Sequence, residues 1–353
     1  MTAGTLNRHS SWAQDTVVST MDPIFSFFVP TFFGTVKNFD TEFIEYDIVE
    51  GGVRIAPYAS PMSLGKSTRD RGYRTYQLKP AYIKLLDTVR PGQGFTRRPG
   101  EQYGGQLTPM QRLQMQEAEK IITHREMIET RWEQMAAEAL FTGMLTIFDE
   151  DYPRAVVDFE RSPNLDITVG TAWTDTANAD PMSDIQAIAE VMNTETRNGA
   201  IADTVTMRSS TFDLVMKNAK FRDSLDKEKN QSSNATQGFE ATGLRSTDKK
   251  AQKRGRLGGQ YDLWTYDGYY ENDSGVQQFF TPLDSVLVTS QQSIDGRRYH
   301  GAIFDMDAGM QALDVFVKTR DLWNPSGREV LTQSAPMLGM RRPNASGVLR
   351  VRA

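Results

Sequence analysis

The stretch TPMQRLQMQEAEKIITHREMIETRWEQMAAEALFTGMLTIF, Thr108–Phe148, decides the fold class. Thr108 suits a helix N-cap, Pro109 suits the first helical position, and Gln111 completes a capping box. Apolar residues then recur at largely helical spacing as far as Leu140. The pattern predicts one unbroken helix from Thr108 to about Phe148, about 60 Å long at ~1.5 Å per residue. A helix this long must lie across a sheet or along a subunit edge, because no single compact domain could surround it.

The charged residues within this stretch are expected to form the exposed face of the helix. They are Glu117, Glu119, Lys120, Arg125, Glu126, Glu129, Arg131 and Glu133.

Extended patterns precede the helix. Residues 1–36 begin polar and end in the phenylalanine-rich stretch IFSFFVPTFF (24–33), which we expect to pack on a neighbouring element or a neighbouring subunit. A strand ends at Gly51-Gly52, and Arg54–Ser60 and Tyr73–Lys79 are then expected to form a long two-stranded arm with a basic tip. Because an isolated hairpin is marginal in water, this one is expected to find its partner in another chain.

A mixed pattern of helices and strands follows, which makes the predicted fold class α+β. Helices are expected over 183–198, with a capping box at Ser183 and Gln186, and over 211–226, while 227–243 reads as a polar loop. The expected strands are 155–159, 167–169, 205–207, 260–270 paired with 276–281, 286–289, and 313–318 paired with 328–332 around a turn at 323–327.

Composition excludes several classes of function. The 353 residues contain no cysteine, so disulfides, thiolate metal sites, iron–sulfur clusters and cysteine nucleophiles are ruled out, and only His9, His124 and His300 are histidines. The net charge of −5 argues against a protein that grips nucleic acid tightly. The most apolar stretch is ten residues long, shorter than the ~20 that span a bilayer, so we expect a protein made in the cytoplasm without a membrane partner.

No motif in the sequence assembles a catalytic, cofactor-binding or metal site. Gly65-Lys66-Ser67 resembles the end of a phosphate-binding loop, but Ser60 stands where that motif needs glycine. Asp149-Glu150-Asp151 and Asp305-Met306-Asp307 are interpreted as acidic turns or helix ends. His124 has no second histidine four residues on, and His300 has no nucleophile at catalytic spacing. The sequence therefore predicts no enzyme, no cofactor and no site residues. The basic segment 245–256 is open to three interpretations: a nucleic-acid patch, a solvated loop, or a charged seam against another subunit.

Several short stretches carry a resemblance to a known family. They are APYASP (56–61), KPAYIK (79–84), VDFERS (157–162) followed by a Trp173 segment, and WNP (323–325) with REVLTQSAP (328–336). In this order and spacing, and across residues 21–340, the chain resembles the Hong Kong 97-type major capsid proteins of tailed phages, in their lambda-like branch. The resemblance implies a subunit that self-assembles into the icosahedral shell of a double-stranded DNA phage and protects the packaged genome.

The resemblance also implies a division of the chain. Residues 1–36 would be an N-terminal arm, 37–106 the E-loop and its flanking strands, 107–170 the P domain with its spine helix, 171–310 the A domain, and 311–353 a return to the P domain. The implied partners are copies of the chain in hexamers and pentamers, packaged DNA in weak non-specific contact, and a decoration or cement protein, a scaffolding protein and a portal. Lys66 at the loop tip suits a crosslinking lysine of some relatives, but no acceptor is assigned. The implied location is the virion, and the host cytoplasm during assembly.

Two alternatives stay open at the level of sequence. The same fold also serves as an encapsulin-like compartment shell, which packaged DNA rather than cargo protein would exclude. An α/β enzyme with its site in 171–310 would instead require a pocket with perturbed titrating groups.

Overall fold

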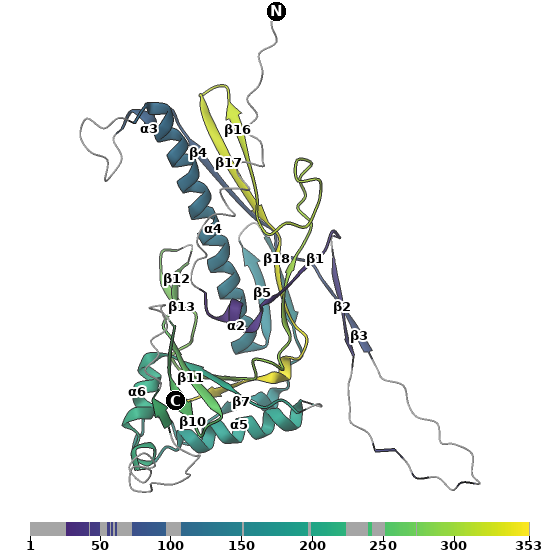
Figure 1. The fold of residues 1–353 in the computed structure, drawn as a ribbon, viewed down its shortest axis with the longest axis vertical. Coiled ribbons are helices and arrows are strands. Elements are labelled where there is room, and N and C mark those ends of the chain that lie inside the picture. The colour runs from purple at the N-terminus through teal and green to yellow at the C-terminus, as the bar shows by residue number, and fades with distance from the viewer. Residues whose placement is uncertain are drawn as a thin grey trace, which may run out of the picture.

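The computed structural model describes residues 26–41, 43–49, 55–56, 58, 61, 73–96, 107–149, 152–196, 199–223, 239–241, 251–272 and 274–352. Its dominant element is the helix α4 (Pro109–Thr142), which runs beside a long antiparallel ribbon (Figure 1). At its foot lies a second body built on a larger sheet. Helices and strands are mixed without a regular alternation, which confirms the α+β class.

The start of α4 forms as predicted. The Thr108 side chain accepts a hydrogen bond from the backbone N–H of Gln111, and the Gln111 side chain accepts one from the backbone N–H of Thr108. The predicted end near Phe148 is wrong. Gly143 takes the left-handed conformation with φ of 72°, which ends the helix, and residues 144–149 form the strand β5 instead.

The sheet beside α4 has three antiparallel strands in the order β16–β17–β4. They are β16 (Phe316–Leu322), β17 (Gly327–Ser334) and β4 (Ile83–Val89). Ile121 of α4 packs against Val317 and Val330 of the sheet. The predicted pairing of the two C-terminal strands around the 323–327 turn is confirmed.

The second body is built on a seven-stranded sheet with the order β7–β19–β14–β8–β11–β10–β9. The strands are β7 (Asp166–Thr168), β19 (Ser346–Arg350), β14 (Ser285–Thr289), β8 (Thr204–Met207), β11 (Tyr261–Tyr266), β10 (Ala251–Leu257) and β9 (Phe239–Ala241). Strands β8 and β14 are buried throughout, and their sequences combine valine, leucine and methionine with serine and threonine.

Two helices accompany this sheet, and their boundaries differ from the predicted ones. Helix α5 (Pro181–Glu195) begins two residues early, because Asp180 rather than Ser183 caps it by accepting a hydrogen bond from the Ser183 N–H. Helix α6 (Ser209–Lys217) begins two residues early and ends at Lys217; after a break at Asn218, residues 219–223 are helical again, within the predicted range 211–226. Within the expected loop 227–243, Phe239–Ala241 is a strand that pairs with β10.

A three-stranded sheet, β1–β15–β18, is formed by strands from distant parts of the chain. Strand β1 (Thr35–Asn38) is parallel to β15 (Gly296–His300), which is antiparallel to β18 (Pro336–Met340). The strand β19, which lies within the segment 311–353, instead pairs with β14 and β7 in the seven-stranded sheet. The division into domains stays a prediction. In that division β19 belongs to the P domain by its position in the sequence, but it pairs with β14, which lies in the predicted A domain.

Three two-stranded ribbons complete the described fold. Strand β5 (Met144–Asp149) pairs with β6 (Tyr152–Asp158), and β12 (Tyr269–Glu271) pairs with β13 (Gln277–Phe279). Strand β2 (Ile44–Val49) pairs with β3 (Tyr73–Leu78), and this hairpin points away from the body of the molecule (Figure 1). The predicted partner of Tyr73–Lys79 was therefore wrong. This strand pairs with the strand before Gly51-Gly52 and not with the segment 54–60.

Candidate assembly surfaces

The N-terminal segment is anchored to the body of its own chain. Helix α2 (Phe28–Phe32) begins over the buried carboxylate of Glu133, which is 2% exposed. The Glu133 carboxylate accepts hydrogen bonds from the backbone N–H groups of Phe27, Phe28 and Val29 at 2.8, 2.7 and 3.0 Å. These are the donors that the first turn of a helix leaves without an intrahelical partner. Burial raises the pKa of Glu133, while the three N–H groups oppose that shift.

The phenylalanine side chains of this segment pack into the main core. Phe27, Phe28, Phe32 and Phe33 are all buried. The Phe27 and Phe28 rings lie 5.3 and 5.1 Å from the ring of Tyr266 in β11. Of the two expected places for the arm, the structure therefore shows a neighbouring element of the same chain for residues 27–33.

Glu133 was assigned to the exposed face of the long helix, and this prediction was wrong. The sequence carried a signal, because Glu133 stands on one stripe with the buried Ala136, Ala137 and Leu140 at i, i+3, i+4 and i+7. A carboxylate on an apolar stripe needs donors brought by another segment. Here those donors include the backbone N–H groups of Phe27 and of the first two residues of α2.

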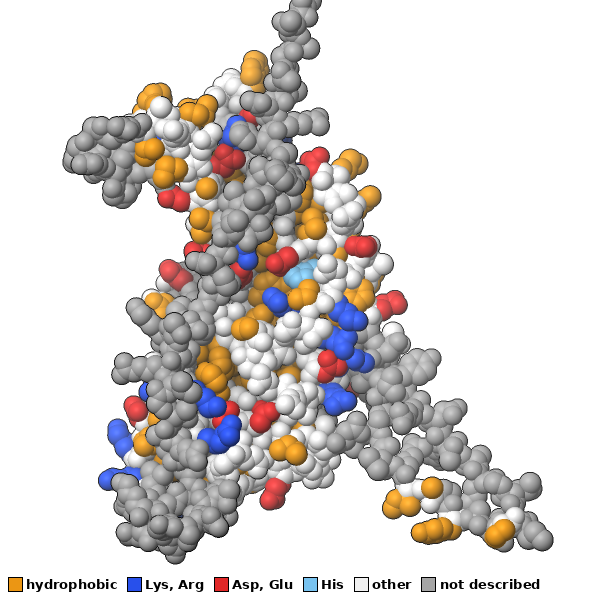
Figure 2. Space-filling view, viewed as in Figure 1, with side chains coloured by type: hydrophobic (Ala, Val, Ile, Leu, Met, Phe, Trp, Pro, Cys, Tyr) orange, Lys and Arg blue, Asp and Glu red, His pale blue; other side chains and the backbone are white. Residues whose placement is uncertain are grey.

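The β2–β3 hairpin shows the opposite behaviour, because it leaves apolar side chains uncovered. Ile44, at its base, is fully buried, but Ile55 and Tyr58 further along are 93% and 97% exposed. Figure 2 shows hydrophobic side chains at the far end of this hairpin, away from the body. Apolar side chains held this far from their own core mark an interaction surface.

Two further sites among the described residues expose a large apolar side chain almost completely. Trp323, at the turn between β16 and β17, is 95% exposed. Met306 is 94% exposed, on a loop held in place by Asp305, whose carboxylate forms an ion pair with Lys318 and accepts a hydrogen bond from Gln333 at 2.8 Å. The loop therefore presents its apolar side chains from a fixed position.

The residues that the sequence singled out for chemistry do not converge. Gly65-Lys66-Ser67 and His9 lie outside the described residues. The Asp305 carboxylate is engaged by Lys318, as above. Within the part of the chain that the structure describes, no group of three or more His, Asp or Glu is arranged to hold a metal ion. No helix among the same residues is long and apolar enough to cross a membrane.

The two described histidines are buried against the long helix and its surroundings. His124 Nδ1 lies 2.8 Å from the Thr332 hydroxyl, and its Nε2 lies 3.3 Å from the Asp87 carboxylate. His124 therefore joins α4 to the β16–β17–β4 sheet. Burial lowers the pKa of His124. The ring of His300 packs on Trp132 with centroids 5.3 Å apart, and burial lowers its pKa also.

The basic segment is partly neutralised within the chain. Lys253 Nζ and Arg256 Nε bind the two carboxylate oxygens of Asp262 at 2.6 and 2.8 Å, and Arg254 Nε donates to the Thr265 hydroxyl at 2.9 Å. These contacts lie within β10 and β11, so this half of the segment is part of a sheet and not a solvated loop. Residues 245–250 lie outside the described part.

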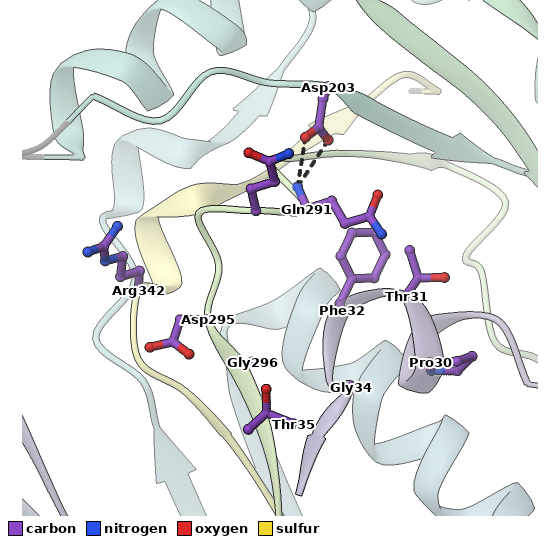
Figure 3. A pocket seen from close by; sticks show the side chains of 11 residues that line it. Pro30, Thr31, Phe32, Gly34, Thr35, Asp203, Gln291, Asp295, Gly296 and Arg342 are labelled. Atoms are coloured by element: carbon purple, nitrogen blue, oxygen red, sulfur yellow. Dashed lines mark hydrogen bonds between the residues drawn. The ribbon is translucent and has the colours of Figure 1, made fainter.

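One cavity among the described residues is open and polar. It has a volume of about 610 Å³ and lies between the end of α2, the turn before β15 and Arg342 (Figure 3). Its Asp203 carboxylate accepts hydrogen bonds from the backbone N–H of Gln291 at 3.0 and 3.1 Å, and Asp295 pairs with Arg297 and Arg341. Its carboxylates are thus engaged in holding loops together.

Taken together, an anchored N-terminal segment, a long helix beside a sheet, and a hairpin that projects from the body define a subunit built to contact other chains. Comparison with known proteins gives the class. The chain matches the family model described as Phage major capsid protein E over residues 12–350 and belongs to this family. It is a major capsid protein of the tailed-phage type, a structural component of the virion, which confirms the resemblance seen in the sequence.

Individual relatives agree with this assignment. The chain is 26% identical to the major capsid protein of Enterobacteria phage P21 over 333 residues, with 92% of this chain and 94% of the relative covered. It is 25% identical to the major capsid protein of Escherichia phage lambda over 331 residues, with 92% of each covered. Among solved structures, the putative capsid protein of an Escherichia coli CFT073 prophage aligns with a TM-score of 0.72 at 20% identity, over 98% of this chain and 99% of that one. The last similarity shows a shared fold.

Proposed function

We propose that copies of this chain tile into a closed shell, as hexamers and pentamers, through the surfaces that the isolated subunit leaves uncovered. The observation that carries the proposal is the projecting hairpin, whose Ile55 and Tyr58 are almost completely exposed. A single antiparallel pair of strands is marginal in water, so this ribbon gains its full stability only against another surface. Apolar burial contributes about 25 cal/mol per Å², and an interface of a few thousand Å² around each subunit can offset the cost of ordering the hairpin.

In this proposal the parts of the chain have separate roles. Residues 37–106 form the E-loop that lies over a neighbouring copy, and 107–170 with 311–353 form the P domain around α4. Residues 171–310 form the A domain, which meets its copies around the five- and six-fold axes. The pairing of β19 with β14 and β7 in the larger sheet supports a firm junction between the P domain and the A domain.

The charge of the chain supports a container for DNA that does not bind it tightly. With a net charge of −5, the subunit would make weak non-specific contacts with the packaged genome, which must enter and leave. We place assembly in the host cytoplasm, with a scaffolding protein, a decoration or cement protein and a portal as further partners. The role is structural and not catalytic, and the engaged carboxylates of the open cavity support this.

The test is electron microscopy of the protein expressed alone at high concentration. Shells, tubes or separate hexamers and pentamers are expected, and a stable monomer would contradict the proposal. Particles purified from an infected or induced host are expected to contain DNA. A particle that contains a cargo enzyme and no DNA would favour an encapsulin-like compartment, which the family match supports less.

A further inference from the structure

One loop of the subunit supports both ends of the projecting β2–β3 hairpin. This supporting loop, residues 301–312, follows β15 and closes on itself through an isolated β-bridge. Its start is fixed by the backbone N–H of Gly301, which donates to the carbonyl of Ala335 at 2.9 Å. Its middle is held on β16 by the ion pair of Asp305 with Lys318. The supporting loop is therefore fixed to the body of the molecule.

The chain that enters the hairpin is bound to this region at two successive residues. The backbone N–H of Phe39 donates to the carbonyl of His300 at 2.9 Å, and the Phe39 ring packs on Tyr299 with centroids 5.5 Å apart. The Asp40 carboxylate then accepts a hydrogen bond from the backbone N–H of Ala312 at 2.8 Å. Asp40 thus ties the entry to the hairpin to the far end of the supporting loop.

The chain that leaves the hairpin lies on the same loop. Pro80, just after β3, is buried, and a Cβ added to Gly301 would lie 2.5 Å from the Pro80 Cγ. Only glycine therefore lets the proline ring approach the loop this closely. The Tyr82 hydroxyl then accepts a hydrogen bond from the backbone N–H of Phe304 at 3.2 Å, and the two rings lie 5.9 Å apart.

Both bases of the hairpin thus rest on one element, while the hairpin itself extends away from the body (Figure 1). Neighbouring strands lie only ~4.8 Å apart, so a small displacement at either base turns the whole ribbon. We propose that the supporting loop sets the direction of the hairpin, with Asp40 as a positioning residue and the Pro80–Gly301 contact as the pivot. The consequence for assembly rests on the proposed function, because the direction decides where the hairpin meets a neighbouring copy.

Distances between two spin labels measure this direction in the unassembled subunit, and the chain has no cysteine of its own to interfere. The labels are placed at Thr75→Cys in β3 and at Glu126→Cys on α4, both exposed positions. In Gly301→Ala the contact with Pro80 must open from 2.5 Å to an ordinary 3.4 Å or more. Across strands ~4.8 Å apart this turns the ribbon by about 0.2 radian, which moves Thr75, ~16 Å further along, by about 3 Å. The control is Gly92→Ala, where an added Cβ meets nothing within 4 Å.

The Asp40 variants test the other base. Asp40→Ala removes the contact with the supporting loop and should widen the distribution of label distances about twofold. Asp40→Asn keeps an oxygen acceptor and should restore the parent width. The matched control is Asp213→Ala, an exposed aspartate on α6, which should leave the width unchanged.

Two results would overturn the proposal. Equal widths in Asp40→Ala and Asp213→Ala would remove the role of Asp40, and equal mean distances in Gly301→Ala and Gly92→Ala would remove the role of the pivot. Urea unfolding shows that each variant is folded. Because the distances are measured before assembly, they test the supporting loop whether or not copies tile into a shell, and electron microscopy of the same variants tests tiling separately.

Discussion

The anchor of the N-terminal segment predicts a large effect from a single side chain. Within the described part of the chain, Glu133 is the acceptor for the N–H groups of Phe27, Phe28 and Val29. Replacing Glu133 with alanine would leave these three buried donors unpaired, at about 1–3 kcal/mol each if α2 stayed in place. Release of α2 avoids that cost but exposes buried phenylalanine side chains, each worth about 1.5–3 kcal/mol.

Because the subunit takes whichever of these two routes costs less, we expect Glu133→Ala to lower the free energy of unfolding by about 3–5 kcal/mol. Glu133→Gln keeps one oxygen acceptor and should lose less. The control is Glu126→Ala on the exposed side of the same helix. Urea unfolding of the unassembled subunit gives the magnitude, and hydrogen exchange of residues 26–33 shows whether α2 is released.

The result that would refute this reasoning is equally specific. If Glu133→Ala and Glu126→Ala had midpoints within about 0.5 kcal/mol of each other, the carboxylate would not be the anchor. Unchanged protection of residues 26–33 in Glu133→Ala would lead to the same conclusion.

Three other predictions follow from the described geometry. Gly143→Ala forces a side chain into φ of 72° and should cost about 1–2 kcal/mol by urea unfolding, whereas Gly170→Ala, where an added Cβ meets nothing within 4 Å, should cost little; equal losses would contradict the cap. Burial lowers the pKa of His124, so the imidazole takes up its proton at a higher pH in the unfolded chain, near 6.5, than in the folded one. The free energy of unfolding should therefore fall as the pH drops through this value. His124→Gln should make the urea midpoint depend less on pH between about pH 7.5 and 5.5. An unchanged slope would contradict that contribution. The double change Ile55→Ser with Tyr58→Ser should leave the subunit within about 0.5 kcal/mol of the parent but reduce particle formation severalfold by light scattering; normal assembly would show that the hairpin is not a contact.

How much of this fold the sequence predicts depends on how local each determinant is. The start of α4 is fixed by the side chains of Thr108 and Gln111, and the sequence predicts it correctly. The end was missed because the left-handed glycine Gly143 sits within an apolar run that continues as the strand β5.

Long-range pairing was harder to predict. Nothing within residues 41–79 distinguishes a pairing of Tyr73–Leu78 with 54–60 from one with 44–49, because both partners read as extended. Likewise β19 joins a sheet whose next strand is more than fifty residues away in sequence, β14.

The sequence predicted that the subunit exposes apolar surface, but it did not predict correctly which residues are exposed. The phenylalanine-rich segment is the most apolar part of the chain, yet its described phenylalanines, Phe27, Phe28, Phe32 and Phe33, are buried in their own subunit. The reason is Glu133, whose partners lie about a hundred residues earlier in the sequence. Among the described residues, the most exposed large apolar side chains instead lie on the hairpin, at Trp323 and at Met306.

The central claim is that copies of this chain complete the surface that each subunit leaves open. A cryo-electron microscopy map of the assembled particle tests it most directly. The account predicts that Ile55 and Tyr58 of every subunit are covered by a neighbouring copy, while residues 27–33 stay on Glu133 of their own chain. A map in which the hairpin folds back on its own subunit and touches no neighbour would contradict it.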